Sequence, residues 1–172
     1  MKILYYHWME NACSDCVASM REQGHDVEIY SEKMENYTRD PAFLEKITRK
    51  LREGYDGIFS FNYFPLLSEA AQEAEIIYFC WVYDSPNLTL ESETLNNPCN
   101  RVCLFDYGLY ENYRRKGFET VDYLPLPCAV HRLDQLLASE RGYRYDMSFV
   151  GRLYDDSYNF YRQIGYLPED MR

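Results

Sequence analysis

Alternating strand and helix signals predict an α/β fold with a doubly wound parallel sheet of five or six strands. Short apolar segments are separated by helical patterns of roughly ten to fifteen residues, which is typical of successive βαβ units. Residues 76–82 are all apolar or aromatic and show no period-2 alternation, so both faces of this segment are expected to be buried. With 172 residues the chain is long enough for one such domain and short for two. These observations together predict a Rossmann-like domain.

The first half of the chain is expected to contain three strands and three helices. The strands are predicted at residues 3–6, 26–30 and 57–61. The first helix is indicated by apolar residues at positions i, i+3, i+4 and i+7, which are Cys13, Cys16, Val17 and Met20. The second helix is marked by Phe43, Ile47 and Leu51. Pro65 suits the first position of the third helix, because the N–H that proline lacks has no intrahelical partner there.

The second half continues the alternation. Strands are predicted at 76–82, 101–105 and 121–124, with a long polar loop at 87–100. Asp106 is a suitable N-cap for a helix that extends to about Lys116. Further elements are a short helix at 131–138, a strand at 145–151 and a tyrosine-rich helix at 157–164. The predicted division is a Rossmann-like domain at 1–127, an interdomain crossing at 128–144 and the beginning of a second domain at 145–172.

The candidate site lies at the carboxyl ends of the strands, where open α/β sheets bind ligands at the point of reversed winding. We expect the strand order 3-2-1-4-5, with this point between the first and fourth strands. His7 and Asp84 follow these strands and are the candidate catalytic residues, since an imidazole or a carboxylate could remove a proton from a substrate hydroxyl. A histidine without a role and a simple turn cap are the alternatives for these two residues. The residues predicted to bind substrate are Trp8, Asn62, Tyr63, Phe64, Ser85 and Asp106.

The cysteines allow a second interpretation. Cys13 and Cys16 have the spacing of a redox pair at a helix start, so a thioredoxin-like oxidoreductase is an alternative function. Both cysteines also share the apolar helix face, so we expect buried, inert thiols without a disulfide. A zinc site would require this pair to meet Cys99 and Cys103, and the three histidines have no metal-ligand spacing. No metal is therefore expected.

Composition and missing motifs exclude several classes of function. The first turn, at residues 7–11, lacks G-x-G-x-x-G, and no P-loop or nucleophile-elbow motif occurs, so no cofactor is expected. The net charge of −10 argues against a nucleic-acid or anionic-membrane partner. No apolar run of about 18 residues exists that could span a membrane. The early polar residues do not fit a signal peptide, which makes a cytoplasmic location with six reduced cysteines the expectation.

Six short motifs occur in an order and spacing that resemble a bacterial protein family. They are Phe61-Asn62-Tyr63-Phe64-Pro65, Cys80-Trp81-Val82-Tyr83-Asp84-Ser85-Pro86, Asn97-Pro98-Cys99-Asn100-Arg101, Leu104-Phe105-Asp106, Leu124-Pro125-Leu126-Pro127 and Asp146-Met147-Ser148-Phe149-Val150-Gly151. The chain resembles the N-terminal domain of GT-B-type glycosyltransferases, akin to the spore-maturation glycosyltransferase-like proteins. The resemblance runs over most of the chain.

The resemblance implies a two-domain enzyme with an active site between two Rossmann-like halves. The N-terminal half would bind the sugar acceptor, and the C-terminal half would bind the nucleotide-sugar. Gly151 would open the donor-side loop, where Arg152 departs from the small polar residue that the family pattern leads us to expect. Because the chain stops at Arg172, the donor half would be missing and the isolated chain would not transfer sugar. The alternative is a non-catalytic binding module on the same fold.

Overall fold

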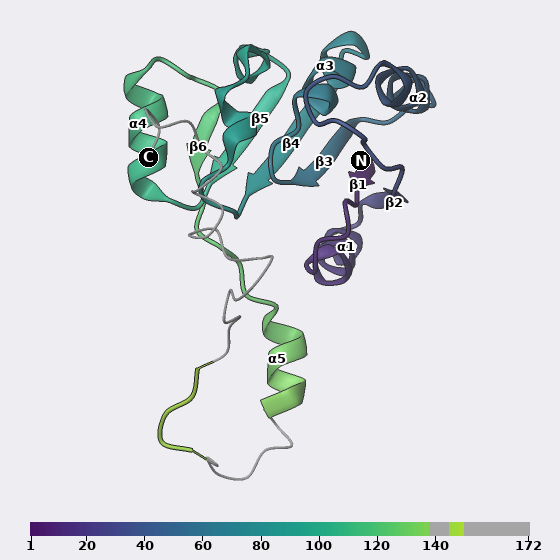
Figure 1. Cartoon of the computed structure of the whole chain (residues 1–172). Coiled ribbons are helices and arrows are strands. Elements are labelled where there is room, and N and C mark those ends of the chain that lie inside the picture. The colour runs from purple at the N-terminus through teal and green to yellow at the C-terminus, as the bar shows by residue number, and fades with distance from the viewer. Residues whose placement is uncertain (138–144, 150–172) are drawn as a thin grey trace. The chain divides into compact units, whose positions relative to one another are not determined.

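Six parallel strands form one sheet in the order β2-β1-β3-β4-β5-β6 (Figure 1). The strands are β1 (Lys2–Tyr6), β2 (Asp26–Tyr30), β3 (Gly57–Phe61), β4 (Ile77–Val82), β5 (Asn100–Leu104) and β6 (Val121–Tyr123). The computed structural model describes residues 1–137 and 145–149. All five strand pairings are parallel, which confirms the predicted α/β class and Rossmann-like sheet.

The strand order expected from the sequence was wrong. β3 pairs directly with β1, with Ile3 opposite Gly57, so the winding reverses between β1 and β3 and not between β1 and β4. Burial explains this order. Every residue of β3 is buried, whereas Asp26 and Glu28 on β2 are exposed. A strand that is apolar on both faces needs a neighbour on each side and helices above and below, and the more polar β2 is suited to the edge.

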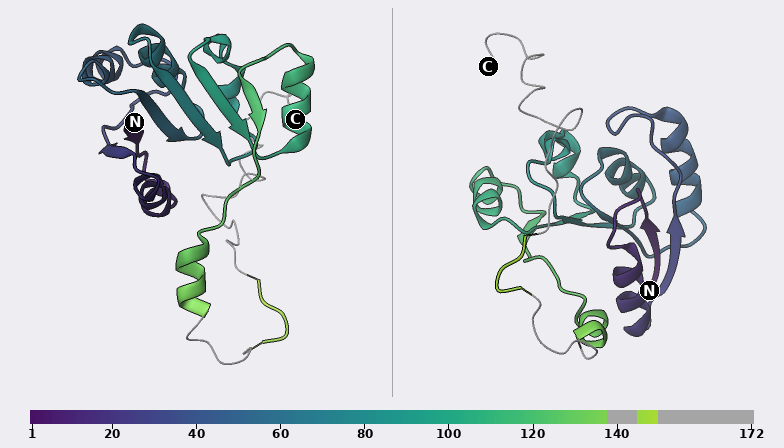
Figure 2. Two further views of the ribbon diagram at one scale, coloured as in Figure 1. Left: turned by 180° about the vertical axis from the view of Figure 1, so that it is seen from behind. Right: turned by 60° about the horizontal axis from the view of Figure 1, so that its bottom comes forward.

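Helices cover both faces of the sheet within residues 1–129 (Figure 2). The helices are α1 (Cys13–Glu22), α2 (Pro41–Leu51), α3 (Pro65–Glu73) and α4 (Tyr107–Arg115), with two 3₁₀ turns, η1 (Leu88–Glu91) and η2 (Glu93–Asn96). α2, α3 and α4 pack on one face, and α1 packs on the other. Asp40 and Asp106 accept hydrogen bonds from the N–H groups of Phe43 and Leu109, which explains where α2 and α4 begin.

β4 is buried on one face only, which corrects the expectation of burial on both. Tyr78, Cys80 and Val82 are buried under the three-helix face. Phe79 and Trp81 point to the other face, where they are half-buried. They stack on the aromatic rings of β3, with centroid distances of 5.8 Å for Phe59–Phe79 and 6.1 Å for Phe61–Trp81. The large apolar side chains of this face thus shield one another across the strands, where α1 does not cover them.

Residues Met1–Ala129 form one compact unit, and a second begins at Val130. The predicted short helix is present as α5 (Val130–Leu137). The described residues 145–149 form no strand, so the strand predicted there is wrong for these positions. The helix predicted at 157–164 lies outside the described residues. Among the residues that the structure describes, no helix has the length and apolar character needed to cross a membrane.

Candidate functional site

The carboxyl ends of β1, β3 and β4 meet at the point where the winding of the sheet reverses. His7 follows β1, Asn62 follows β3, and Asp84 lies two residues after β4. Three of the predicted site residues are therefore brought to one edge of the sheet. Because β3 lies between β1 and β4, Asn62 occupies the centre of this edge.

Asn62 joins the ends of β3 and β4 through its side chain. Its Nδ2 donates to Asp84 Oδ2 at 2.6 Å, while its Oδ1 accepts from the backbone N–H groups of Tyr83 and Asp84, both at 3.2 Å. The residue is 8% exposed and has a φ of 58°, in the left-handed region that asparagine tolerates better than most residues. The short amide side chain thus serves both the turn and the alignment of Asp84.

Buried hydrogen bonds fix the turn that carries Asn62. Ser60 Oγ donates to the Asn62 carbonyl at 2.8 Å, and the backbone N–H of Phe64 donates to the Tyr78 hydroxyl at 3.0 Å. Ser60 and Tyr78 are fully buried and lie 2.7 Å apart through their hydroxyl oxygens. A buried network in which each member has a partner is rigid. The backbone at Asn62 is therefore held before any ligand arrives.

Asp84 is exposed at this edge while its orientation is fixed by Asn62. The bond to Asn62 involves Oδ2 and not Oδ1. Ser85 is also exposed and is followed by a cis peptide bond to Pro86. A carboxylate oriented by a buried amide and open to solvent can accept a hydrogen bond from a ligand hydroxyl. Asp84 and Ser85 are the predicted residues whose surroundings best suit contact with a substrate.

Tyr83, the residue before Asp84, belongs to an aromatic pair. Trp8 and Tyr83 are half-buried and stack with ring centroids 6.3 Å apart and planes inclined by 22°. Trp8 Nε1 donates to the Phe61 carbonyl at 2.8 Å, which ties the loop after β1 to β3. Burial, with the charges of Asp84 and Glu10, raises the pKa of Tyr83 to about 12. Tyr83 was not among the predicted site residues, although it directly precedes Asp84 in the sequence.

Two predicted substrate-binding residues belong to the core. Tyr63 is 1% exposed, stacks on Tyr78, and its hydroxyl lies 2.8 Å from Thr94 Oγ1. Phe64 is 4% exposed and packs edge-on against Tyr6 with centroids 5.4 Å apart. The left-handed turn at Asn62 directs Tyr63 and Phe64 into the core, where Phe64 also packs edge-on against Trp8 with centroids 6.2 Å apart. Their predicted role in substrate binding is therefore replaced by packing.

Asp106 is half-buried and acts as the N-cap of α4. Its Oδ1 accepts from the Leu109 N–H at 2.7 Å, as the sequence also predicted. This capping bond gives the residue a structural role, and it uses only one of the two carboxylate oxygens. Gly151 and Arg152, predicted for the donor side, lie outside the described residues.

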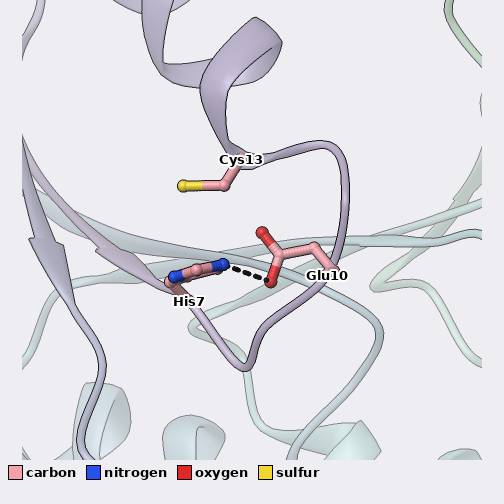
Figure 3. A group of neighbouring side chains, drawn as sticks. All are labelled: His7, Glu10 and Cys13. Carbon is pink, nitrogen blue, oxygen red and sulfur yellow. Dashed lines mark ion pairs between the residues drawn. The ribbon is translucent and has the colours of Figure 1, made fainter.

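Three potential metal ligands converge between β1 and α1 (Figure 3). His7 follows β1, Glu10 lies in the loop, and Cys13 is the first residue of α1. One ligand atom of each lies within 4.8 Å of the other two, and His7 Nε2 is 3.8 Å from Glu10 Oε2. The sequence interpretation overlooked Glu10, for which the available signal was an acid four residues after the first strand.

The Glu10 carboxylate is buried and hydrogen-bonded on both oxygens. The residue is 6% exposed. Its Oε1 accepts from the Tyr5 hydroxyl at 2.5 Å, and its Oε2 accepts from the Trp8 N–H at 3.1 Å. A buried carboxylate requires such partners, because the loss of hydration is otherwise not offset. Glu10 thereby links β1 to the loop that carries Trp8.

The thiols of α1 lack the properties of a redox pair. Cys13 and Cys16 are both free, as predicted, but half-buried and not fully buried. Burial raises the pKa of the Cys13 thiol, and it raises that of Cys16 to about 12, with the neighbouring Cys13 and Glu10 adding to the effect. Reactive thiols of oxidoreductases have lowered pKa values, which make the thiolate available near neutral pH. The two cysteines therefore do not support the thioredoxin-like alternative.

A shallow hollow of about 300 Å³ lies beside the end of β2 and along α2, apart from the predicted residues. It is lined by Tyr30, Glu32, Lys46, Arg49, Lys50 and Glu53. Its charges largely pair with one another: Lys46 with Glu32, and Lys50 with Glu53 at 2.6 Å. The hollow contains none of the residues predicted for the site.

Comparison with known proteins gives no family for this chain. No protein-family model matches it, and no curated protein matches it. A solved structure of D-2-hydroxyisocaproate dehydrogenase is similar, with a TM-score of 0.38 and 18% sequence identity. The similarity covers 62% of this chain and 30% of that one, so the chain spans about a third of the dehydrogenase. A likeness at this level carries no argument about function, and the Rossmann-like description depends on the parallel strand pairings of the chain itself.

Proposed function

We propose that this chain is the acceptor-binding half of a GT-B-type glycosyltransferase. The observation that carries the proposal is the exposed Asp84 carboxylate, which is oriented by Asn62 and directly follows Tyr83, whose ring stacks with that of Trp8. Sugar recognition commonly combines an apolar ring face with a hydroxyl acceptor, and an aromatic side chain beside a carboxylate offers both. The motifs that resemble this family include Asn62, Tyr83, Asp84 and Ser85.

In the proposed reaction Asp84 acts as the general base. An acceptor hydroxyl donates a hydrogen bond to Asp84 and loses its proton to this carboxylate as its oxygen attacks the anomeric carbon of the donor sugar. The bond from the anomeric carbon to the phosphate oxygen breaks, and the nucleotide leaves with the electron pair. Asn62 is the positioning residue, because its amide holds Asp84 Oδ2. His7, which follows the neighbouring strand, is the second candidate for a catalytic role.

The nucleotide-sugar belongs to a second, donor-binding domain in this proposal, and Gly151 and Arg152 would lie on its side. The turn after β1 has no glycine-rich loop for a pyrophosphate, which supports this division of roles. We also propose a cytoplasmic location and no nucleic-acid partner. Six free thiols and a net charge of −10 are consistent with both.

The test begins with binding of sugars to the 172-residue chain. Saturation-transfer NMR with a panel of mono- and disaccharides should detect weak binding of at least one sugar. The variants Asp84→Ala and Trp8→Ala should lose this signal, while Glu119→Ala, an exposed acid after α4, should retain it. Calorimetry should detect no tight binding of uridine diphosphate, since the chain lacks a phosphate-binding loop. Micromolar binding of uridine diphosphate would contradict the assignment to the acceptor half.

Transfer itself is tested in a protein that joins this chain to a donor-binding domain. Asp84→Asn preserves the size of the side chain and should lower the transfer rate by about 100-fold or more, as expected for loss of a general base. Unchanged transfer would show that Asp84 only shapes the turn. Sugar binding that depends on Asp84, without transfer by the joined protein, would indicate a non-catalytic binding module.

A further inference from the structure

We propose that His7, Glu10 and Cys13 form a binding site for a divalent metal ion of the zinc type. The three side chains offer an imidazole nitrogen, a carboxylate oxygen and a sulfur, with all three ligand atoms within 4.8 Å of one another (Figure 3). This set of ligands is borderline in softness, which suits Zn²⁺ and Co²⁺ better than Mg²⁺ or Ca²⁺. With the ion bound, His7 serves as a ligand and not as the second catalytic candidate, while the proposed role of Asp84 as general base does not depend on this site.

The distances are close to those of a tetrahedral site. Metal–ligand bonds of about 2.0 to 2.3 Å separate neighbouring ligand atoms by roughly 3.3 to 3.6 Å. His7 Nε2 and Glu10 Oε2 are already 3.8 Å apart. The separations to Cys13 Sγ therefore have to shorten by up to about 1.2 Å, which side-chain rotation of the half-buried His7 and Cys13 can supply.

Hydrogen bonds that would orient the Glu10 carboxylate toward an ion are already formed. The Tyr5 hydroxyl and the Trp8 N–H hold the carboxylate, one on each oxygen. Hydrogen bonds of this kind orient carboxylate ligands in metal proteins. They also keep a charged group in a position where its side chain has no solvent exposure. A fixed, buried carboxylate next to an imidazole is a prepared ligand, and the proposed transfer reaction does not use it.

The charges balance when the ion is bound. Cys13 releases its proton to solvent on binding, so that a thiolate, a carboxylate and a neutral imidazole surround an ion of charge +2. The resulting cluster has no net charge, which favours a site that is largely removed from water. Three protein ligands leave a fourth tetrahedral position for a water molecule or a ligand atom, the arrangement of catalytic and not of closed structural zinc sites.

Cobalt spectroscopy on the full 172-residue chain tests the site. Titration of the reduced, metal-free protein with Co²⁺ should give one equivalent of binding, with a near-ultraviolet sulfur-to-cobalt band and visible bands of a tetrahedral ion. Zn²⁺ should then displace the cobalt and abolish these bands. Cys13→Ser should remove the sulfur band, and His7→Ala should weaken binding by more than about 100-fold, beyond the loss typical for a residue that only orients a ligand.

Matched variants separate this site from other thiols. Cys16→Ser, one turn further along α1 and likewise half-buried, and Cys128→Ser, which is exposed, should leave the spectrum unchanged. Circular dichroism shows whether each variant is folded, so loss of metal is not confused with loss of structure. Absence of a sulfur–cobalt band in excess Co²⁺, or the same spectrum in Cys13→Ser as in the original chain, overturns the proposal.

Discussion

Asn62 shows how one residue can meet two requirements at once. Its backbone has a φ of 58°, which only glycine adopts freely, and its amide makes three hydrogen bonds to the end of β4. Glycine would adopt the positive φ but could not make the side-chain hydrogen bonds, and aspartate would place a second carboxylate beside Asp84. Asparagine satisfies both demands, because its short amide is uncharged and carries a donor and an acceptor.

Substitutions of Asn62 should separate the contribution of its backbone conformation from that of its side-chain hydrogen bonds. We expect Asn62→Ala to lower the free energy of unfolding by about 2 to 4 kcal/mol, through lost hydrogen bonds and the cost of a left-handed alanine. Asn62→Gly should be less destabilising than Asn62→Ala by about 1 kcal/mol, because only the hydrogen bonds are lost. Urea unfolding of the three proteins measures both differences. Equal stability of the two variants would mean that φ at this position is not positive in solution.

Of the residues that follow β3, one lies at the candidate site and the next two are buried in the core, which limits what a sequence can predict about a site. Asp84 and Asn62 were correctly expected to meet, because carboxyl ends of parallel strands share one edge. Tyr63 and Phe64 were expected there for the same reason, but the left-handed turn directs them into the core. Glu10 was missed, since its importance depends on contacts with Tyr5 and Trp8 that no spacing rule encodes.

At the scale of the elements, the helix caps hold the clearest sequence signals. Asp40 and Asp106 each precede an apolar helical pattern, and each accepts a hydrogen bond from the N–H three residues later. Asp106 was expected both as a cap and as a substrate-binding residue, and its bond to Leu109 fits the first role.

A pair of substitutions at Asp106 distinguishes the cap from a binding residue. Asp106→Ala should lower the free energy of unfolding by about 1 kcal/mol, and Asp106→Ser should restore most of this loss, because serine is also a good N-cap. Chemical denaturation of both variants provides the measurement. If sugar binding disappears in Asp106→Ser while its stability is retained, the substrate-binding role would be the correct one.

The bounds of the elements followed from the sequence far better than their order in space. Apolar periodicity and caps are local, and they located all six strands of residues 1–129 to within a few positions. Strand order depends on pairings between distant segments, such as β1 with β3. The clue that was available was the polarity of β2, with exposed Asp26 and Glu28, which suits an edge. The aromatic run of β4 was less informative, because its half-buried face resembles a buried one in sequence.

At the scale of the whole molecule, the core holds many groups that lose protons only in strong base. Burial raises the pKa of Tyr63 to about 12, and burial together with Asp122 raises that of Cys103 to about 11. Burial likewise raises the pKa of Tyr78, which is fully enclosed, and that of Cys16 to about 12. The neutral form of each group is thus the form that the folded chain accommodates.

Stability should therefore fall in alkaline solution. The unfolded chain releases thiol protons near pH 9, whereas the folded chain keeps those of Cys16 and Cys103 until about pH 12 and pH 11. The stabilisation is fully present below the unfolded pKa and is lost as the pH rises toward the folded values. Between about pH 8 and pH 11 we expect the free energy of unfolding to decrease by at least about 2 kcal/mol, measured by urea unfolding.

Single-thiol variants provide the control for this pH dependence. Cys16→Ala removes one of the titrating groups and should make the decrease smaller, while Cys128→Ala, at an exposed position, should leave it unchanged. A stability that stays constant up to pH 11 in the original chain would contradict the raised pKa values of the buried thiols and phenols.

Both tryptophans of the chain lie at the carboxyl edge of the sheet. Trp8 donates its indole N–H to the Phe61 carbonyl beside the candidate site, and Trp81 donates to the Leu124 carbonyl, where the chain leaves the sheet. Indole fluorescence responds to the polarity around the ring and to its hydrogen bond. The intrinsic tryptophan fluorescence of this protein therefore comes from two indole rings at one edge of the sheet, Trp8 at the candidate site and Trp81 next to the segment that follows β6. The amino ends of the strands contribute no indole signal. The molecule carries an optical probe of its own site, without any label.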